Sequence, residues 1–125
     1  MNTRNKIVAR EDLASFLSGA PAILVIGSFD PMLAPLAARL VELSRPDEFK
    51  LVTAVSCDPN GTVLSLGARL EMTAALAVVD FVLPYEFGLE TAFPWTAIYD
   101  ETALHARWSA EFKQHVRRRS LPATA

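Results

Sequence analysis

The feature that most constrains the fold is a short, uninterrupted apolar run, Ala22–Ile26, together with a second run, Leu51–Val55, that is rich in β-branched residues. Five apolar residues without polar alternation are typical of a strand that is buried on both faces, as in a parallel sheet. Between the runs, apolar residues recur at helical spacing until about Ser44, and Pro46 follows where a proline does no harm. The sequence therefore predicts a strand, a helix and a second strand, the order of a βαβ unit.

The rest of the chain continues this alternation. Each further segment was assigned from the spacing of its apolar residues and from the Gly, Pro and Asp residues at its ends. The further predicted elements are a helix over Arg10–Leu17, a helix over Leu66–Ala77, a strand over Val79–Leu83, one possible helical turn within 85–94, a strand over Trp95–Tyr99 and a long helix from Asp100.

This order predicts an α/β fold: one Rossmann-like, three-layer domain with a parallel sheet of four to five strands and helices on both faces. A length of 125 residues suits a single domain over 1–125, and we expect the ends, 1–5 and 121–125, to be flexible. In such a sheet, ligands bind beyond the carboxyl ends of the strands. The turns Gly27–Pro31 and Ser56–Gly61 are therefore the candidate positions for a site.

Composition argues against several classes of partner. Twelve Lys and Arg residues against fourteen Asp and Glu residues give a net charge of -2, which offers no reason to expect nucleic acid or an anionic membrane as a partner. No apolar stretch reaches the roughly 18 residues of a membrane span, so we expect a cytoplasmic location. The lone Cys57 excludes an internal disulfide and is expected to be a buried, inert thiol.

Three ordered motifs resemble the cytidylyltransferase-type nucleotidyltransferase family, especially heptose-1-phosphate adenylyltransferases and glycerol-3-phosphate cytidylyltransferases. Gly27–Asp30 resembles the family's G-x-F-D, and Val55–Asp58 resembles V-N-S-D. Arg69–Leu76 followed by Val79–Val82 resembles R-x-E-x-x-x-A-L and V-D-Y-V, and the lead-in at Lys6–Val8 is also similar. The resemblance implies the same fold and ligand-binding roles for six residues, Gly27, Ser28, Phe29, Asp30, Asp58 and Arg69.

The same comparison indicates lost catalysis. After G-x-F-D the family continues x-x-H-x-G-H, but Leu33 and Leu36 stand at the two histidine positions and Pro35 stands at the glycine position. Nucleotidyl transfer needs fixed donors aimed at the developing phosphate charge, and leucine donates nothing. Pro35 also removes a backbone N–H from the helix end that would bind the anion.

Two further family features are missing. The family's basic loop corresponds to Asn60–Gly67, which has no charge, and its late Ser/Thr-rich phosphate motif is replaced by Asp100–Thr102, whose two carboxylates would repel a polyphosphate. No cofactor is therefore certain. If activity remained, we would expect Mg²⁺ with Arg69 in a rearranged site, and we predict no other metal site.

Several single residues have two interpretations. Asp30 would orient a ligand or cap the helix that follows. Arg69 would contact a phosphate, as its matched position implies, or be a solvated helix residue. Asp80 is predicted as a structural acceptor at a strand edge. His105 and His115 are ten residues apart, too far for an i,i+4 metal pair, and we expect both at the surface or its boundary.

Three hypotheses for function follow. The chain is a non-catalytic binding or regulatory domain that keeps a nucleotide or another small ligand. Alternatively, it is an active adenylyl- or cytidylyltransferase that acts on a sugar phosphate. Alternatively, it is a structural protein that pairs through its last helix, as a homodimer or with another protein. The inward stripe of that helix is predicted to be Leu104, Trp108, Phe112 and Val116.

Overall fold

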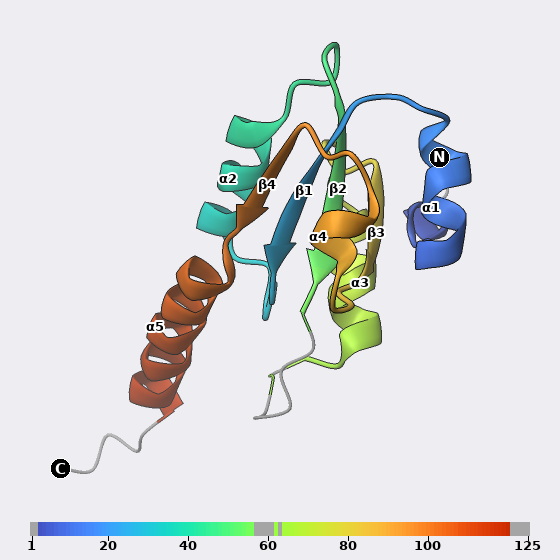
Figure 1. The fold of residues 1–125 in the computed structure, drawn as a ribbon. Coiled ribbons are helices and arrows are strands. Elements are labelled where there is room, and N and C mark those ends of the chain that lie inside the picture. The colour runs from blue at the N-terminus through green and yellow to red at the C-terminus, as the bar shows by residue number, and fades with distance from the viewer. Residues whose placement is uncertain (1–2, 57–61, 63, 121–125) are drawn as a thin grey trace, which may run out of the picture.

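The computed structural model describes residues 3–56, 62 and 64–120, and in it helices alternate with parallel strands. The predicted α/β class is confirmed (Figure 1). The elements are η1 (Thr3–Lys6), α1 (Arg10–Leu17), β1 (Ala22–Gly27), α2 (Ala34–Leu43), β2 (Lys50–Val55), α3 (Leu66–Ala74), β3 (Phe81–Pro84), α4 (Leu89–Ala92), β4 (Ala97–Asp100) and α5 (Thr102–Ser120).

The sheet has four parallel strands in the order β3-β2-β1-β4. Every residue of β1 is buried, because this strand is central and both of its faces are covered. The chain moves from β1 outward to β3 and then returns to the other side of β1 for β4. The carboxyl ends of β1 and β4 therefore form the point at which the strand order reverses, where open α/β sheets bind ligands.

Successive side chains of the strands enter two apolar cores. On one face, Leu24 and Ile26 of β1 belong to a core with Leu13 of α1 and Leu89 of α4. The opposite face holds the second core, in which residues from β1 lie with Leu40 of α2 and Leu70 of α3. This period of two, with helices over both faces, gives the three layers that the sequence predicts.

Most differences from the predicted elements lie at their ends. The third helix ends at Ala74, three residues early, and β3 begins at Phe81 because the chain turns between them, where the Val79 N–H bonds the Leu76 carbonyl. The fourth strand begins at Ala97, two residues later than predicted. Residues 3–5, expected to be flexible, belong to η1, whereas residues 1–2 and 121–125 lie outside the described part.

Three apolar residues on α1, α2 and α5 are more than 40% exposed, including Val116 of the predicted inward stripe. Phe16 is 52% exposed but contacts the Phe81 ring at 5.7 Å between centroids. Val41 is 58% exposed, since α2 turns it away from the sheet, and Val116 is 44% exposed because α5 extends away from the sheet beyond the carboxyl ends of the strands (Figure 1). None of the described helices is both long enough and apolar enough to cross a membrane.

Candidate functional site

The candidate site is the segment Gly27–Asp30, which follows β1 at the reversal of the strand order. It lies between α3, whose Arg69 reaches it from one side, and α5, whose His105 reaches it from the other. Four of the predicted ligand residues are thus adjacent, and Arg69 is brought to them across 41 positions of sequence. Asp58 and Cys57 lie outside the described residues.

The imidazole of His105 occupies the space directly over Gly27. A Cβ atom built on Gly27 would overlap the Cε1 and Nδ1 atoms of that ring. The Phe29 ring contacts the imidazole edge-on, with 4.4 Å between centroids and an angle of 78°. Glycine is needed at position 27 because only a residue without a side chain leaves room for the ring.

A hydrogen bond fixes the orientation of this imidazole. The Phe29 N–H donates to His105 Nδ1 at 3.2 Å, so Nδ1 is unprotonated and the neutral ring carries its proton on Nε2. The ring is 2% exposed, and burial lowers the pKa of His105 from 6.5 to about 4, against a smaller opposing effect of the Glu101 charge. The expectation that His105 lies at the surface is therefore wrong, whereas His115 is exposed as predicted.

Phe29 supplies this N–H from an uncommon backbone conformation. Its φ is +47°, in the left-handed region that costs a non-glycine residue about 1 kcal/mol. The Phe29 side chain is nevertheless fully buried and belongs to the core that α2 and α3 cover. Strain of this kind persists only where the surroundings fix the residue, and here the core and His105 do so.

Three polar residues, one directly before α5 and two on the same face within it, hold this helix to the rest of the chain. Glu101, His105 and Ser109 follow one another at four-residue spacing. Ser109 Oγ donates to the Asp30 carbonyl at 2.7 Å, and Glu101 Oε1 accepts from Arg39 Nε at 2.7 Å. The contacts of α5 with the Gly27–Asp30 segment are therefore the hydrogen bonds of His105 and Ser109 and the ring contact of His105 with Phe29.

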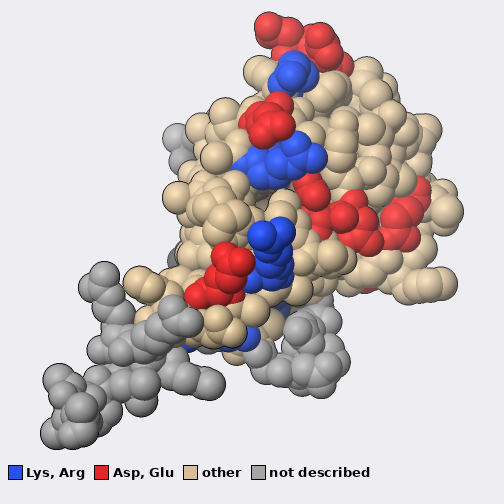
Figure 2. Space-filling model, turned by 90° about the vertical axis from the view of Figure 1, so that its left-hand side faces the viewer, with Lys and Arg blue, Asp and Glu red and all other residues tan. Residues whose placement is uncertain are grey.

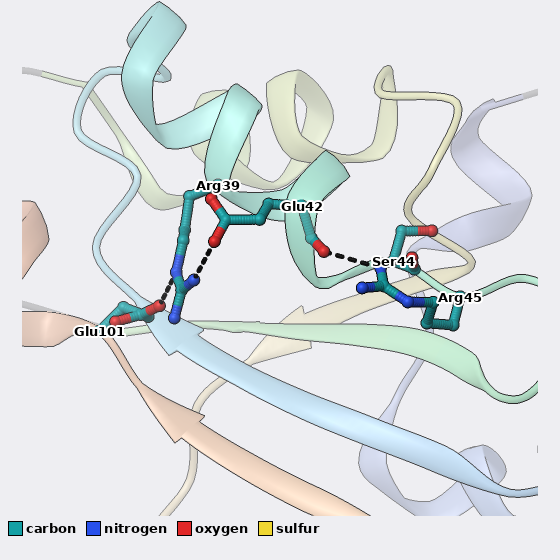
Figure 3. Close-up of polar contacts among 5 residues, drawn as sticks. All are labelled: Arg39, Glu42, Ser44, Arg45 and Glu101. Atoms are coloured by element: carbon teal, nitrogen blue, oxygen red, sulfur yellow. Dashed lines mark hydrogen bonds and ion pairs between the residues drawn. The ribbon is translucent and has the colours of Figure 1, made fainter.

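Figure 3 shows how α2 takes part in this attachment. The guanidinium of Arg39 lies between Glu101 and Glu42, whose Oε1 accepts from Nη1 at 3.1 Å. The same guanidinium lies 5.8 Å from the centroid of the Tyr99 ring of β4. The hydrogen bond that Arg39 donates to Glu101, more than the Glu101 charge, raises the pKa of Arg39. The start of α5 is thus anchored to α2, as well as to β4 through the chain itself.

Arg69 joins the carboxyl ends of two strands. Its Nη1 donates to the carbonyl of Ser28 at 2.9 Å and to the carbonyl of Ser56 at 2.7 Å. The residue is 2% exposed, so its interpretation as a solvated helix residue is wrong. None of the ion pairs between described residues includes Arg69, and its Nε is buried without a hydrogen-bond partner in that part of the chain.

Asp30 is a buried bridge and does not cap α2. Its Oδ1 accepts from the Leu64 N–H at 2.8 Å, and the residue is 4% exposed. The helix begins at Ala34 with Leu33 at the N-cap position and no side-chain cap, so that interpretation of Asp30 is wrong. Asp30 lies three residues before the N-cap position, and its carboxylate is directed to the segment before α3 instead.

The two positions that correspond to the family's histidines are apolar in structure as well as in sequence. Leu36 is 2% exposed and lies in the first turn of α2, whereas Leu33 is half-buried. Pro35 is the second residue of α2. The Leu36 N–H is already bonded to the Leu33 carbonyl, so this helix end offers few backbone donors to an anion.

The remaining predicted residues have structural roles or none at this site. Asp80 Oδ2 accepts from the Leu51 N–H at 2.8 Å, which confirms its predicted role as a structural acceptor. Asp100 Oδ1 accepts from the Thr102 N–H, so it caps α5, although the helix begins later than predicted. Within the described residues, no group of three or more His, Cys, Asp or Glu side chains could hold a metal ion.

Sequence reasoning missed His105 and Ser109, the two side chains of α5 that bond the site. The predicted apolar stripe of this helix is only half-buried at Leu104, Trp108 and Phe112. The four-residue spacing of Glu101, His105 and Ser109 was a usable signal, since it places three polar residues on one helix face. Comparison with protein-family models gave no match, and comparison with curated proteins gave none either.

Proposed function

We propose that this chain is a nucleotidyltransferase-like domain that has lost nucleotidyl transfer and acts as a binding or regulatory domain. The single observation that carries the proposal is the position of His105 over Gly27. The resemblance gives Gly27, the first residue of the G-x-F-D motif, a ligand-binding role, for which the space over its bare backbone would have to be open. Here the chain's own imidazole fills that space.

The side chains around the segment support the loss of catalysis. Leu33 and Leu36 carry no donor, and the removal of one donor to a developing oxyanion typically costs about 10²–10³ in rate. Arg69, the one guanidinium bonded to the segment among the described residues, uses Nη1 to bond two backbone carbonyls. Positioning and charge stabilisation, on which phosphoryl chemistry depends, are both weakened.

The surface agrees with a small-molecule or protein ligand. Figure 2 shows the face that carries α2 and α5, where basic and acidic side chains alternate and no broad basic area forms among the described residues. A nucleic-acid-binding face would gather Lys and Arg side chains into one patch or stripe. We therefore do not propose nucleic acid as a partner.

Turnover and binding assays test this proposal directly. The purified protein is mixed with ATP or CTP, Mg²⁺ and a sugar phosphate, and pyrophosphate release is measured against a heat-inactivated control. We expect no release above the control. The chain would be an active transferase if pyrophosphate release keeps a constant specific activity through further purification and is lower in a folded Arg69→Lys variant.

A retained anion site at Arg69 is a second candidate, and it is favoured by the Nε atom, which has no hydrogen-bond partner among the described residues. A buried cation without a described carboxylate partner is costly unless something neutralises it, and a phosphate-sized anion would do so. We expect phosphate and pyrophosphate to raise the Tm of the wild-type protein more than that of Arg69→Lys, because lysine keeps the charge but lacks Nε. An equal rise in both proteins would indicate only a general salt effect.

A third candidate is a structural role, in which two copies of the chain pair through α5. Its support is the apolar surface that the outer half of the helix leaves uncovered, since Val116 is 44% exposed and Phe112 is half-buried. Sedimentation over a hundredfold range of protein concentration separates it from the others. A dimer that Val116→Glu and Phe112→Glu both abolish would favour this role, whereas a monomer throughout would exclude a homodimer.

A further inference from the structure

We infer that His105 is an internal ligand of its own chain, because its ring fills a slot between Gly27 and Phe29. This slot is suited to a flat nitrogen heterocycle. It becomes open to such a ligand when α5 detaches from the sheet. A regulatory role for this slot rests on the proposed function, because the slot adjoins Ser28, which Arg69 contacts in the candidate site. Its physical basis is independent of any nucleotide.

The slot has the features of a binding site for a heteroaromatic ring. Its floor is the bare backbone of Gly27, which leaves room for a planar group, and the Phe29 ring supplies an edge-on aromatic contact at 4.4 Å. The Phe29 N–H supplies one donor, which selects a ring with an unprotonated sp² nitrogen. Imidazole satisfies all three requirements, and so would similar rings that present such a nitrogen.

The attachment of α5 is suited to release. The bonds of Glu101, His105 and Ser109 are polar, so water can replace each of them when the helix leaves. The apolar residues on the same part of the helix, Leu104 and Trp108, are only half-buried. Of residues 110–116, only Phe112 is half-buried and the others are exposed, so little burial opposes movement of this outer part of α5, which extends away from the sheet (Figure 1).

The main test empties the slot and refills it with free imidazole. His105→Ala removes the ring, and His115→Ala is the matched control because it makes the same change at an exposed position of the same helix. At pH 8, where imidazole is neutral, we expect saturable binding to His105→Ala. It should raise the Tm and change the NMR chemical shifts of the backbone amides of residues 27–30 during the titration. His115→Ala and the wild type should show neither. Equal responses in all three proteins, or none in His105→Ala, would overturn the inference.

A second variant expels the ring without changing α5. The new Cβ of Gly27→Ala would overlap the imidazole, whereas Gly67→Ala adds a Cβ with nothing within 4 Å. In hydrogen exchange, we expect the amides at 105–109 to exchange about tenfold faster in Gly27→Ala and at the wild-type rate in Gly67→Ala. Unchanged exchange in folded Gly27→Ala would contradict the role of His105 in holding α5.

The wild-type protein provides a test that needs no variant. Native-state hydrogen exchange at increasing denaturant should show the α5 amides opening before those of β1, as a unit of lower stability. If α5 and β1 open together under all conditions, the helix does not detach on its own and the inference fails. Because no arm of these experiments involves a nucleotide, their outcome is separate from that of the turnover assay.

Discussion

At the scale of single residues, His105 ties stability to pH. Its pKa is about 4 in the folded protein and 6.5 when exposed, so the unfolded chain binds the proton first on acidification. The contribution of neutral His105 is therefore complete above about pH 6.5, falls between pH 6.5 and 4, and is lost below that window.

We predict that acidification from pH 7 to 4.5 destabilises the wild type by about 2 kcal/mol more than His105→Gln. Urea unfolding at the two pH values measures this difference. His115→Gln should follow the wild type, because His115 is exposed. Parallel pH dependence of the wild type and His105→Gln would contradict the buried, neutral imidazole.

The apolar positions at the start of α2 also make a residue-scale prediction. Leu36→His should lower the free energy of unfolding by about 2–5 kcal/mol, since it replaces a core leucine by a buried polar ring. Leu33→His, at the half-buried N-cap position, should cost clearly less. Urea midpoints measure both, and similar costs would mean that Leu36 does not lie in the core.

At the scale of elements, Arg39 of α2 pairs with two carboxylates of unequal burial, Glu101 at the start of α5 and Glu42 within α2. The side chain of Glu101 is 14% exposed and that of Glu42 is 71% exposed. We predict that Glu101→Gln destabilises the fold by about 1 kcal/mol and Glu42→Gln by about 0.3 kcal/mol. Urea unfolding at low and high salt measures the loss of stability in each variant. A larger loss for Glu42→Gln than for Glu101→Gln would contradict the role of Glu101 as the main partner of Arg39.

The elements also show what the sequence could and could not predict. Arg10–Leu17 and the central strand were predicted well because a buried strand and an amphipathic helix leave local patterns. The burial of Arg69 and His105 depends on contacts across 41 and 76 positions, with Ser28 and Phe29 respectively, and a local pattern does not contain them. By contrast, the interpretation of Leu33 and Leu36 as replacements for histidines comes from the motif resemblance alone, and the structure shows only that Leu36 is buried and Leu33 half-buried.

At the scale of the whole molecule, the two tryptophans report on different parts of the fold. Trp95 packs against the core formed with α1 and α4 and donates from Nε1 to the Leu89 carbonyl, whereas Trp108 lies on α5. If α5 detaches first, Trp108 should change its environment first.

We predict that Trp95→Phe, which keeps Trp108, shows its fluorescence transition at a lower urea concentration than Trp108→Phe, which keeps Trp95. Circular dichroism of each variant serves as the control for global unfolding. Coincident transitions by all three probes would indicate one cooperative unit that includes α5.

The close packing of Gly27 against His105 has a consequence for related sequences. A histidine at position 105 can take this place only if position 27 is glycine, because any Cβ there overlaps the ring. The reverse does not hold, since a glycine at 27 tolerates any smaller residue at 105. Homologues should therefore show a one-sided covariation between the two positions, which divides them into sequences that carry their own occupant of the slot and sequences that leave it vacant.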